Sequence, residues 1–487
     1  MQIQSEAQGE ETVIITKKEW EKALAQEREI AYLKHELAQL KRLLYGSKKE
    51  RFINPDQSQM SLDLAGVEEK TPAEETQQIN YERKKKKGKA KRLLLPPHLP
   101  REEEILEPEG LPDGAERIGE DVTEILEYRP GKIHVRRMVR PVYKTEEKII
   151  SAPLPTLPIP GGNAGPGLLA YILISKFIDH LPFYRIVQMF KREQVKLAES
   201  TVNGWYKTTA KLLMPLYEAL LRKIHDANYI LADETPIPVL SSSKPGSTHK
   251  GYHWAYLLSR ENIMLFSYSP SRGQQCPSEL LSSYQGALQT DGYGVYDQFD
   301  RPGITLLACM AHARRKFEQA KDNDRERANH VLGQMQMLYE IERRAKDDGM
   351  SNDQRYELRQ KEAVRILEKL EAYLKDAYTQ VLPKSAIAKA IAYTLKLWPR
   401  LIRYTENGEW MIDNNAVENK IRPIALGRKN YMFAGSHEAA QHAAMMYSFF
   451  ATCKMNDINP FDWLKDTLTQ IPDYKVNQLE ELLPLKK

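Results

Sequence analysis

Residues 229–240 read YILADETPIPVL, an apolar run that contains the acidic pair Asp233 and Glu234. A short run of this kind, rich in β-branched residues, predicts a strand of a sheet. Two other stretches set an acidic residue in a comparable place. Asp291 ends an apolar run at a Gly-rich turn in ALQTDGYGVYD, and Glu418 opens a helix-like segment in WMIDNNAVENKIRP. A fold that joins these stretches would gather three carboxylates in one pocket.

Crowded carboxylates repel, which raises their proton affinity unless a cation joins them, and hard oxygen ligands suit Mg²⁺ or Mn²⁺. Two metal ions held by three carboxylates can activate an attacking oxygen and stabilise a leaving oxygen at phosphorus. Asp233, Asp291 and Glu418 are therefore predicted to be catalytic metal ligands for phosphoryl transfer, with two Mg²⁺ or Mn²⁺ ions per site.

Each of these residues also has a plain structural interpretation. Asp233 could be a turn residue at a strand end, Asp291 the start of an Asp-Gly turn, and Glu418 the third residue of a capping box begun by Asn415. The joint occurrence of the three at matching places favours catalysis. Because side chains alternate along a strand, Glu234 is predicted to point to the opposite face and not to bind metal.

The surrounding pattern predicts an α/β core. Five strand-like runs are expected, with a helix between the third and fourth and another after the fifth, which is ribonuclease-H-like order. Residues 321–404 are almost wholly helical in pattern and split this core into 227–320 and 405–455, with a tail at 456–487. The fold class is therefore multidomain α+β, with an all-helical insertion in the catalytic core.

Residues 166–226 have helical spacing of apolar residues, with a turn near 194–199. A short helix, a turn and a polar-faced helix predict a helix-turn-helix domain that reads DNA, although a helical bundle gives the same pattern. Ser200 or Thr201 is expected to cap the third helix, and Thr201, Asn203 and Lys207 are candidate DNA contacts.

The N-terminal residues 1–50 contain leucine heptads. Leu33 and Leu40 fall at d positions and Ile30, Leu37 and Leu44 at a positions, which predicts a parallel coiled coil and at least a dimer. A helix packed on its own protein is the alternative. Residues 51–92 are predicted to be a disordered basic linker, 93–150 a small β-rich module, and 151–165 a Pro/Gly linker.

Charge is concentrated in one segment of the chain. The net charge is +5, but residues 81–92, YERKKKKGKAKR, carry +7, so the rest sums to −2. This run is either a solvated linker or a contact to DNA phosphates. Cys276, Cys309 and Cys453 are widely separated, which argues against disulfides and structural zinc. No signal peptide or membrane helix is expected, which indicates a soluble cytoplasmic protein.

The chain resembles the transposases of the insertion sequence 66 family over nearly its whole length. The matching motifs, in order, are LLYGSKKERF, LADET, TDGYGVYD, HARRKF, DNNAVENKIRP, GRKNYMFAGS and NPFDWL. The resemblance implies a ribonuclease-H-like core with catalytic Asp233, Asp291 and Glu418. It also implies metal-dependent cutting of DNA at the ends of the element, and joining of the 3′-hydroxyls to target DNA. Two small accessory proteins are further possible partners.

Five cations follow the predicted catalytic segments and are expected to contact phosphates, with a solvated helix face as the alternative: His312, Arg314, Arg315, Arg428 and Lys429. Residues 93–150 resemble a segment that often carries a four-cysteine zinc site, but they contain no cysteine, so no zinc is expected. A DNA-binding repressor without chemistry and a structure-specific nuclease of the same fold are the alternative functions.

Overall fold

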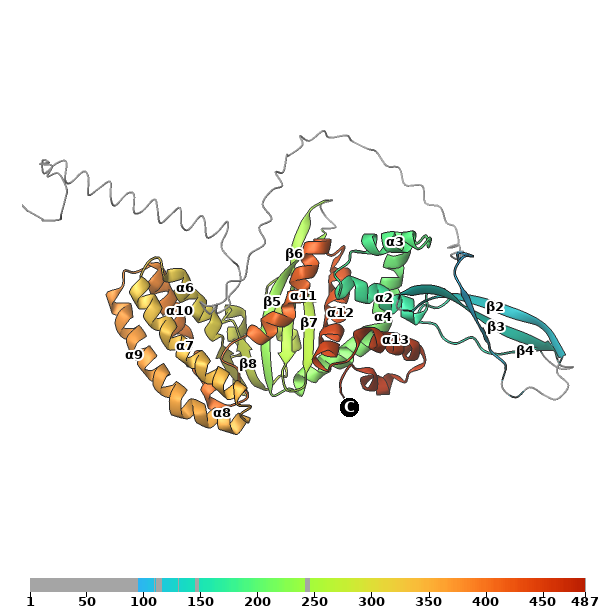
Figure 1. Cartoon of the computed structure of the whole chain (residues 1–487). Helices are drawn as coiled ribbons and strands as arrows, with labels where there is room; N and C mark the ends of the chain where they lie inside the picture. The colour runs from blue at the N-terminus through green and yellow to red at the C-terminus, as the bar shows by residue number, and fades with distance from the viewer. Residues whose placement is uncertain are drawn as a thin grey trace, which may run out of the picture. The chain divides into compact units, whose positions relative to one another are not determined.

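The computed structural model describes residues 95–108, 110, 116–129, 131–144, 149–240 and 246–486. The predicted coiled coil and basic linker lie outside the described residues. Within the part that is described, no helix is both long and apolar enough to cross a membrane. The described residues form two separate sheets with many helices, so the α+β class is confirmed (Figure 1).

The first sheet lies in the segment predicted to be β-rich. Its strands are β1 (Arg101–Ile105), β2 (Glu116–Arg129), β3 (Lys132–Lys144) and β4 (Ile149–Ser151). β2 and β3 form a long antiparallel hairpin, β1 runs parallel to β3, and β4 runs antiparallel to it. Ile125, Met138 and Leu157 make a small apolar cluster of their own. Apolar packing therefore contributes to the fold of this segment.

Glu127 on β2 connects this sheet to the first helix after it. The side chain is buried, and its Oε1 accepts the backbone N–H of Leu168 at 3.0 Å in the first turn of α2. Glycines at 165 and 167 make room, since a Cβ at either position would come within 2.4 Å of a Glu127 oxygen. A negative charge at a helix N-terminus is stabilising, so Glu127 acts as a cap supplied by another element.

Three helices follow as the periodicity predicted: α2 (Pro166–Phe177), α3 (Phe183–Arg192) and α4 (Glu199–Arg222). The prediction that Ser200 or Thr201 caps α4 is wrong. The helix starts at Glu199 with Ala198 at the N-cap and no side-chain cap. Val195 and Leu197 are buried in the core just before it. Their burial fixes the chain ahead of Ser200, which becomes part of the first turn.

The second sheet has the order β7-β6-β5-β8-β9, and its strands are the five that were predicted. They are β5 (Tyr229–Leu240), β6 (Thr248–Leu258), β7 (Ile263–Ser269), β8 (Gly286–Thr290) and β9 (Ile304–Ala308). β5, β6 and β7 are antiparallel neighbours, whereas β8 and β9 run parallel to β5. The helical elements that join or follow them are α5 (Gln275–Leu280), the 3₁₀ turn η2 (Gly294–Phe299) and α6 (Met310–Ala320).

The edge strand β7 is covered by a C-terminal helix. The C-terminal helices are α11 (Asn415–Tyr431), α12 (His437–Met455) and α13 (Pro460–Gln470), and α12 lies along β7 (Figure 1). The hydroxyls of Thr452 and Ser448 on α12 accept the backbone N–H groups of Met264 and Phe266, at 3.1 and 2.8 Å. Unpaired edge groups invite strand addition, and here side chains satisfy them.

The helical insertion is present as predicted. It contains α7 (Arg325–Asp347), α8 (Asn352–Leu358), a π-helical turn (Arg359–Ala363), α9 (Val364–Gln380), α10 (Ala386–Leu401) and the 3₁₀ turn η4 (Arg403–Glu406). Capping is conventional here: Asp324 caps α7, Ser385 caps α10, and Ser351 forms a capping box with Gln354 at the start of α8.

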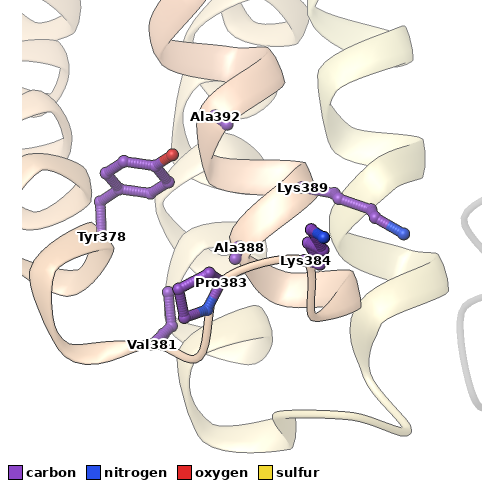
Figure 2. A pocket seen from close by; sticks show the side chains of 7 residues that line it. All are labelled: Tyr378, Val381, Pro383, Lys384, Ala388, Lys389 and Ala392. Atoms are coloured by element: carbon purple, nitrogen blue, oxygen red, sulfur yellow. The ribbon is translucent and has the colours of Figure 1, made fainter.

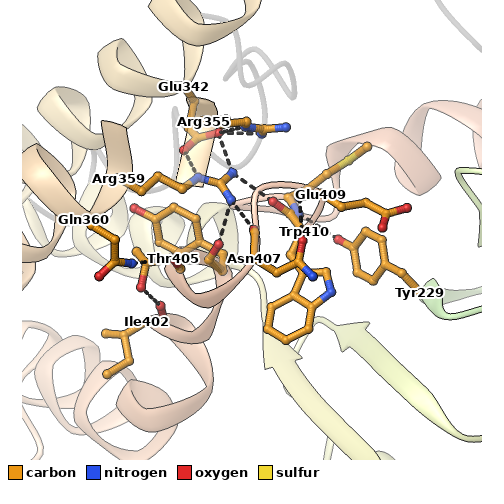
Figure 3. Close-up of polar contacts among 12 residues, drawn as sticks. Tyr229, Glu342, Arg355, Arg359, Gln360, Ile402, Thr405, Asn407, Glu409 and Trp410 are labelled. Carbon is orange, nitrogen blue, oxygen red and sulfur yellow. Dashed lines mark hydrogen bonds and ion pairs between the residues drawn. The ribbon is translucent and has the colours of Figure 1, made fainter. Parts of the chain in front are cut away.

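Arg359, in the π-helical turn, is fully buried and joins the insertion to the chain that returns to the core (Figure 3). Its guanidinium pairs with Glu342 on α7 at 2.7 Å and donates to the carbonyls of Tyr404, Asn407 and Trp410 at 2.6–2.8 Å. One side chain therefore holds the backbone of this returning segment at three points, a few residues before the predicted catalytic helix.

We predict that Arg359→Met destabilises the protein strongly. The change removes one of the two arginine partners of Glu342 and leaves three buried carbonyls without their donor. Breaking a buried pair costs about 3–5 kcal/mol. Arg344→Met is the matched control, because the Arg344 pair with Glu362 is half exposed and such pairs are worth at most about 1 kcal/mol. Thermal unfolding followed by circular dichroism measures both, and equal stability of the two variants would refute the prediction.

Candidate active site

Asp233 on β5 and Asp291 after β8 both lie just beyond the point where these two parallel strands stop pairing. β5 pairs with β8 only as far as Leu231, so Asp233 stands just beyond the end of the paired region. Asp291 directly follows the last residue of β8. Ligand sites in open α/β sheets occur beyond the carboxyl ends of parallel strands, and both acids occupy such a position.

Three carboxylates come together here, and one of them was not predicted. Oxygens of Asp233, Asp291 and Glu234 all lie within 4.8 Å of one another. Glu418 on α11 belongs to a neighbouring group, in which Cys309 Sγ and a ring nitrogen of His312 lie within the same distance of it. His312 Nδ1 is 3.9 Å from Glu418 Oε1. The structure thus brings the three predicted acids to one end of the sheet, in two adjoining groups.

The expectation that Glu234 points away from the other acids is wrong. Its side chain is only 2% exposed, and its carboxylate lies with those of Asp233 and Asp291. Alternation along the strand fails to separate them because β8 ends beside this part of β5 and Asp291 occupies the open end. Sequence reasoning missed Glu234 for that reason, although the adjacent acids in LADET were the available signal.

Asn414 holds the start of α11 against the sheet. This fully buried residue donates from its side-chain amide to the carbonyl of Ala232, next to Asp233, at 2.9 Å. Its backbone N–H contacts Cys309 Sγ, just after β9, at 3.2 Å. Asn414 therefore ties the helix that carries Glu418 to β5 and to the end of β9.

Of the plain structural interpretations of the three acids, only that of Asp291 agrees with the structure. Asp233 lies inside β5, not at its end. The N-cap residue of α11 is Asn414, and its side chain makes no capping hydrogen bond, so no capping box begins at Asn415. The Asp-Gly turn does exist, because Asp291 Oδ1 accepts the N–H of Tyr293 at 2.8 Å. Asp291 is thus a turn residue as well as a member of the acidic group.

Burial and mutual repulsion dominate the electrostatics of this cluster. Burial raises the pKa of Asp233 well above its usual value, and the charges of Glu234, Asp291 and Glu418 raise it further. Burial also raises the pKa of Glu234, as does the charge of Asp291, while the hydrogen bond from Arg272 opposes the rise. Such a site favours either protons or a cation.

The donor chemistry fits a divalent metal ion. The group of Asp233, Glu234 and Asp291 offers only carboxylate oxygens, the ligands that Mg²⁺ and Mn²⁺ prefer. One of these oxygens, Glu234 Oε2, is buried and has no hydrogen-bond partner among the described residues. Cys309 is buried, and burial raises the pKa of its thiol, which leaves it a poor ligand for a hard cation.

The predicted cations have varied surroundings. Arg314 donates to Glu318 at 2.9 Å, and Arg428 donates to Thr235 and Pro236 on β5. Lys429 is exposed and Arg315 partly so. On α4, Lys207 is exposed and lies 3.7 Å from Glu438, while Asn203 donates to the carbonyl of Glu199. Thr201 is partly exposed in the same first turns.

Among the pockets in the described part of the chain, two open ones lie outside the acidic cluster. One, of about 390 Å³, is lined by residues of α9, α10 and their connection, including Tyr378, Lys384 and Lys389 (Figure 2). The other, of about 500 Å³, is lined by the ends of β5 and β6 and by Arg428. Apart from Arg428, neither contains a predicted site residue.

Comparison with known proteins supplies the family. Residues 161–442 match the family model described as Transposase IS66 family, and residues 448–485 match its C-terminal element. Residues 32–103 match a model described as Transposase C of IS166 homeodomain. That segment precedes the helices α2–α4 in which we predicted a helix-turn-helix.

The chain also has relatives of similar length. An uncharacterized protein of Sinorhizobium fredii, y4jD, is 33% identical over 93% of this chain and 94% of its own length. Another from the same organism, y4qI, is 32% identical over 93% of this chain and 88% of its own length. The chain belongs to the IS66 family of transposases. Membership implies a DNA-binding protein that uses divalent metal ions.

The raised pKa of Asp233 means that the folded protein favours the protonated carboxyl group. The stability that this group contributes is therefore present at low pH and is lost as the pH rises through the raised pKa. We therefore predict that, in EDTA, Asp233→Asn unfolds a few degrees higher than the parent at pH 8, and that the difference shrinks toward pH 4. Scanning fluorimetry across this range tests it. A parent that is more stable than the variant at pH 8 would contradict the electrostatic account.

Proposed function

We propose that this protein is a transposase that binds the terminal inverted repeats of its insertion sequence, cuts at their ends, and joins the 3′-hydroxyls to target DNA. The observation that carries the proposal is the gathering of Asp233, Asp291 and Glu418 at one end of the second sheet. Family membership supplies the substrate, and the carboxylates supply the means of phosphoryl transfer.

We further propose that β5–β9 with their helices form a ribonuclease-H-like core. The order of three strands, a helix, a strand, a helical turn and a strand supports this, as does the return of the chain through α11 after the insertion. The proposal keeps the predicted domain boundaries: a helix-turn-helix domain at 166–226, a core at 227–320 and 405–455, and an insertion at 321–404.

Asp233, Asp291 and Glu418 would hold two divalent ions, Mg²⁺ or Mn²⁺. When bound, such ions supply activation of the attacking oxygen and stabilisation of the leaving oxygen in an in-line displacement. The protein must hold these carboxylates in place. Asn414 does so for Glu418, because it fixes the start of α11 to the backbone of Ala232.

Cations near the carboxylates would bind the DNA backbone. Lys429, which is exposed, and Arg315, which is partly exposed, suit phosphate contact, whereas Arg428 supports β5 through Thr235 and Pro236. His312 lies beside Glu418 and would contact a phosphate only at the cut site itself. The repeat ends would be paired by at least a dimer, in which residues 1–50 form the coiled coil. Two accessory proteins of the element remain candidate partners.

We predict that Asp233→Asn, Asp291→Asn and Glu418→Gln each abolish cleavage and strand transfer. Each change removes a charged ligand, and a loss of ~3 kcal/mol in transition-state stabilisation already lowers the rate about a hundredfold. Cleavage of a labelled repeat end in Mg²⁺ measures the first step, and joining to a plasmid measures the second.

Binding of repeat DNA, measured by fluorescence anisotropy, should survive in all three variants. Near-parental cleavage by any of them would remove that residue from the site. Cleavage by the parent without joining would identify a nuclease, and specific binding without cleavage would identify a repressor.

For α4, we predict that Lys207→Ala weakens binding to all DNA and lowers the slope of log affinity against log salt by ~1, as expected for one lost phosphate contact. Asn203→Ala should instead reduce discrimination between repeat and random DNA. Lys465→Ala, an exposed lysine on α13, is the control. If both α4 variants bind like the control, another segment, such as residues 32–103, reads the repeats.

A further inference from the structure

Glu234 occupies an unusual position for a residue without a role in the site. Its side chain is 2% exposed, and Arg272 pairs with only one of its oxygens, with Nε 2.7 Å from Oε1. Oε2 is buried without a hydrogen-bond partner in the described part of the chain. A carboxylate oxygen of Glu234 lies within 4.8 Å of oxygens of both Asp233 and Asp291.

This arrangement is costly for the protein in the absence of a cation. A buried polar atom without a partner loses its hydration and gains nothing in return, and the loss is larger for a charged group. Arg272 supplies a single positive charge to a group of three carboxylates. A residue that served only to pair with Arg272 would have no reason to keep one buried oxygen unpaired and to hold its carboxylate within 4.8 Å of two other acids.

We propose that Glu234 is a fourth carboxylate of the metal site, which binds a divalent ion together with Asp291 through the oxygen that Arg272 leaves unpaired. The proposal rests on the metal-dependent function proposed above and extends it. Four carboxylates then serve the site, namely those of Asp233, Glu234, Asp291 and Glu418.

Arg272 is the positioning residue in this arrangement. Its guanidinium lies 3.9 Å from the ring centroid of Tyr293, and the Tyr293 hydroxyl donates to the carbonyl of Arg272 at 3.3 Å. The N–H of Tyr293 in turn holds Asp291 Oδ1 at 2.8 Å. Glu234 and Asp291 are therefore fixed relative to each other by a chain of contacts that passes through Arg272 and Tyr293.

A purely structural ion pair between Glu234 and Arg272 is the competing explanation. The two explanations differ for variants of Arg272. If Glu234 binds metal, Arg272→Met keeps the ligand itself. The loss of its positioning contact is offset in part by the loss of a competing cation, so Mn²⁺ binding falls less than in Glu234→Gln. If the pair only maintains the fold, loss of either partner has the same consequence.

Binding of Mn²⁺ to the metal-free full-length protein, measured by electron paramagnetic resonance of the free ion, tests the proposal without any activity assay. We expect Glu234→Gln to weaken Mn²⁺ binding by about tenfold or more, the scale of loss for groups that support a metal site. Arg272→Met should remain within about threefold of the parent. Glu279→Gln, on the exposed surface of α5, is the matched control and should bind like the parent.

Parental Mn²⁺ affinity in a folded Glu234→Gln variant would overturn the proposal, and so would equal losses in Glu234→Gln and Arg272→Met. Either result leaves the proposed function intact as long as Asp291→Asn loses both Mn²⁺ binding and cleavage. Unchanged Mn²⁺ binding and cleavage in Asp233→Asn and Asp291→Asn would refute the proposed function itself.

Discussion

The contact of Asn414 with the backbone of Ala232 is the constraint on which the site depends. Asp233 and Asp291 are brought together by strand pairing, which is local to the sheet. Glu418 arrives only after an insertion of some eighty residues, so strand pairing does not fix its position. The buried amide of Asn414, 2.9 Å from the Ala232 carbonyl, links the two parts next to Asp233 itself. A buried hydrogen bond of this kind is costly to break, because both groups would be left unpaired.

The insertion contributes to the same placement from the other side. Arg359 binds three carbonyls between 404 and 410, and the N–H of Met411 is held by the hydroxyl of Tyr229 at the start of β5. Figure 3 shows these contacts converging on the segment that leads to Asn414. A long insertion usually loosens the chain around it. Here its buried arginine orders the return path, so the insertion supports the site even though it provides no ligand.

Much of this arrangement could be predicted from the sequence. The five strands, the helical insertion and α2–α4 follow from apolar periodicity, which reports burial directly. The start of α4 and the orientation of Glu234 could not be predicted in the same way. Burial of Val195 and Leu197 determines where α4 starts, and the end of β8 beside Asp291 determines the orientation of Glu234. Both depend on contacts between segments, which a local pattern does not contain.

The two groups of ligand atoms also explain why this site requires so much support. Asp233, Glu234 and Asp291 repel one another, so the folded chain must hold them together against their charges. Strand pairing, the Asn414 contact and the Arg272–Tyr293 stack each oppose that repulsion from a different element. A divalent cation would convert the same repulsion into binding energy. The repulsion within the metal-free cluster therefore increases the affinity of the site for a metal ion, because the surrounding fold holds the carboxylates together.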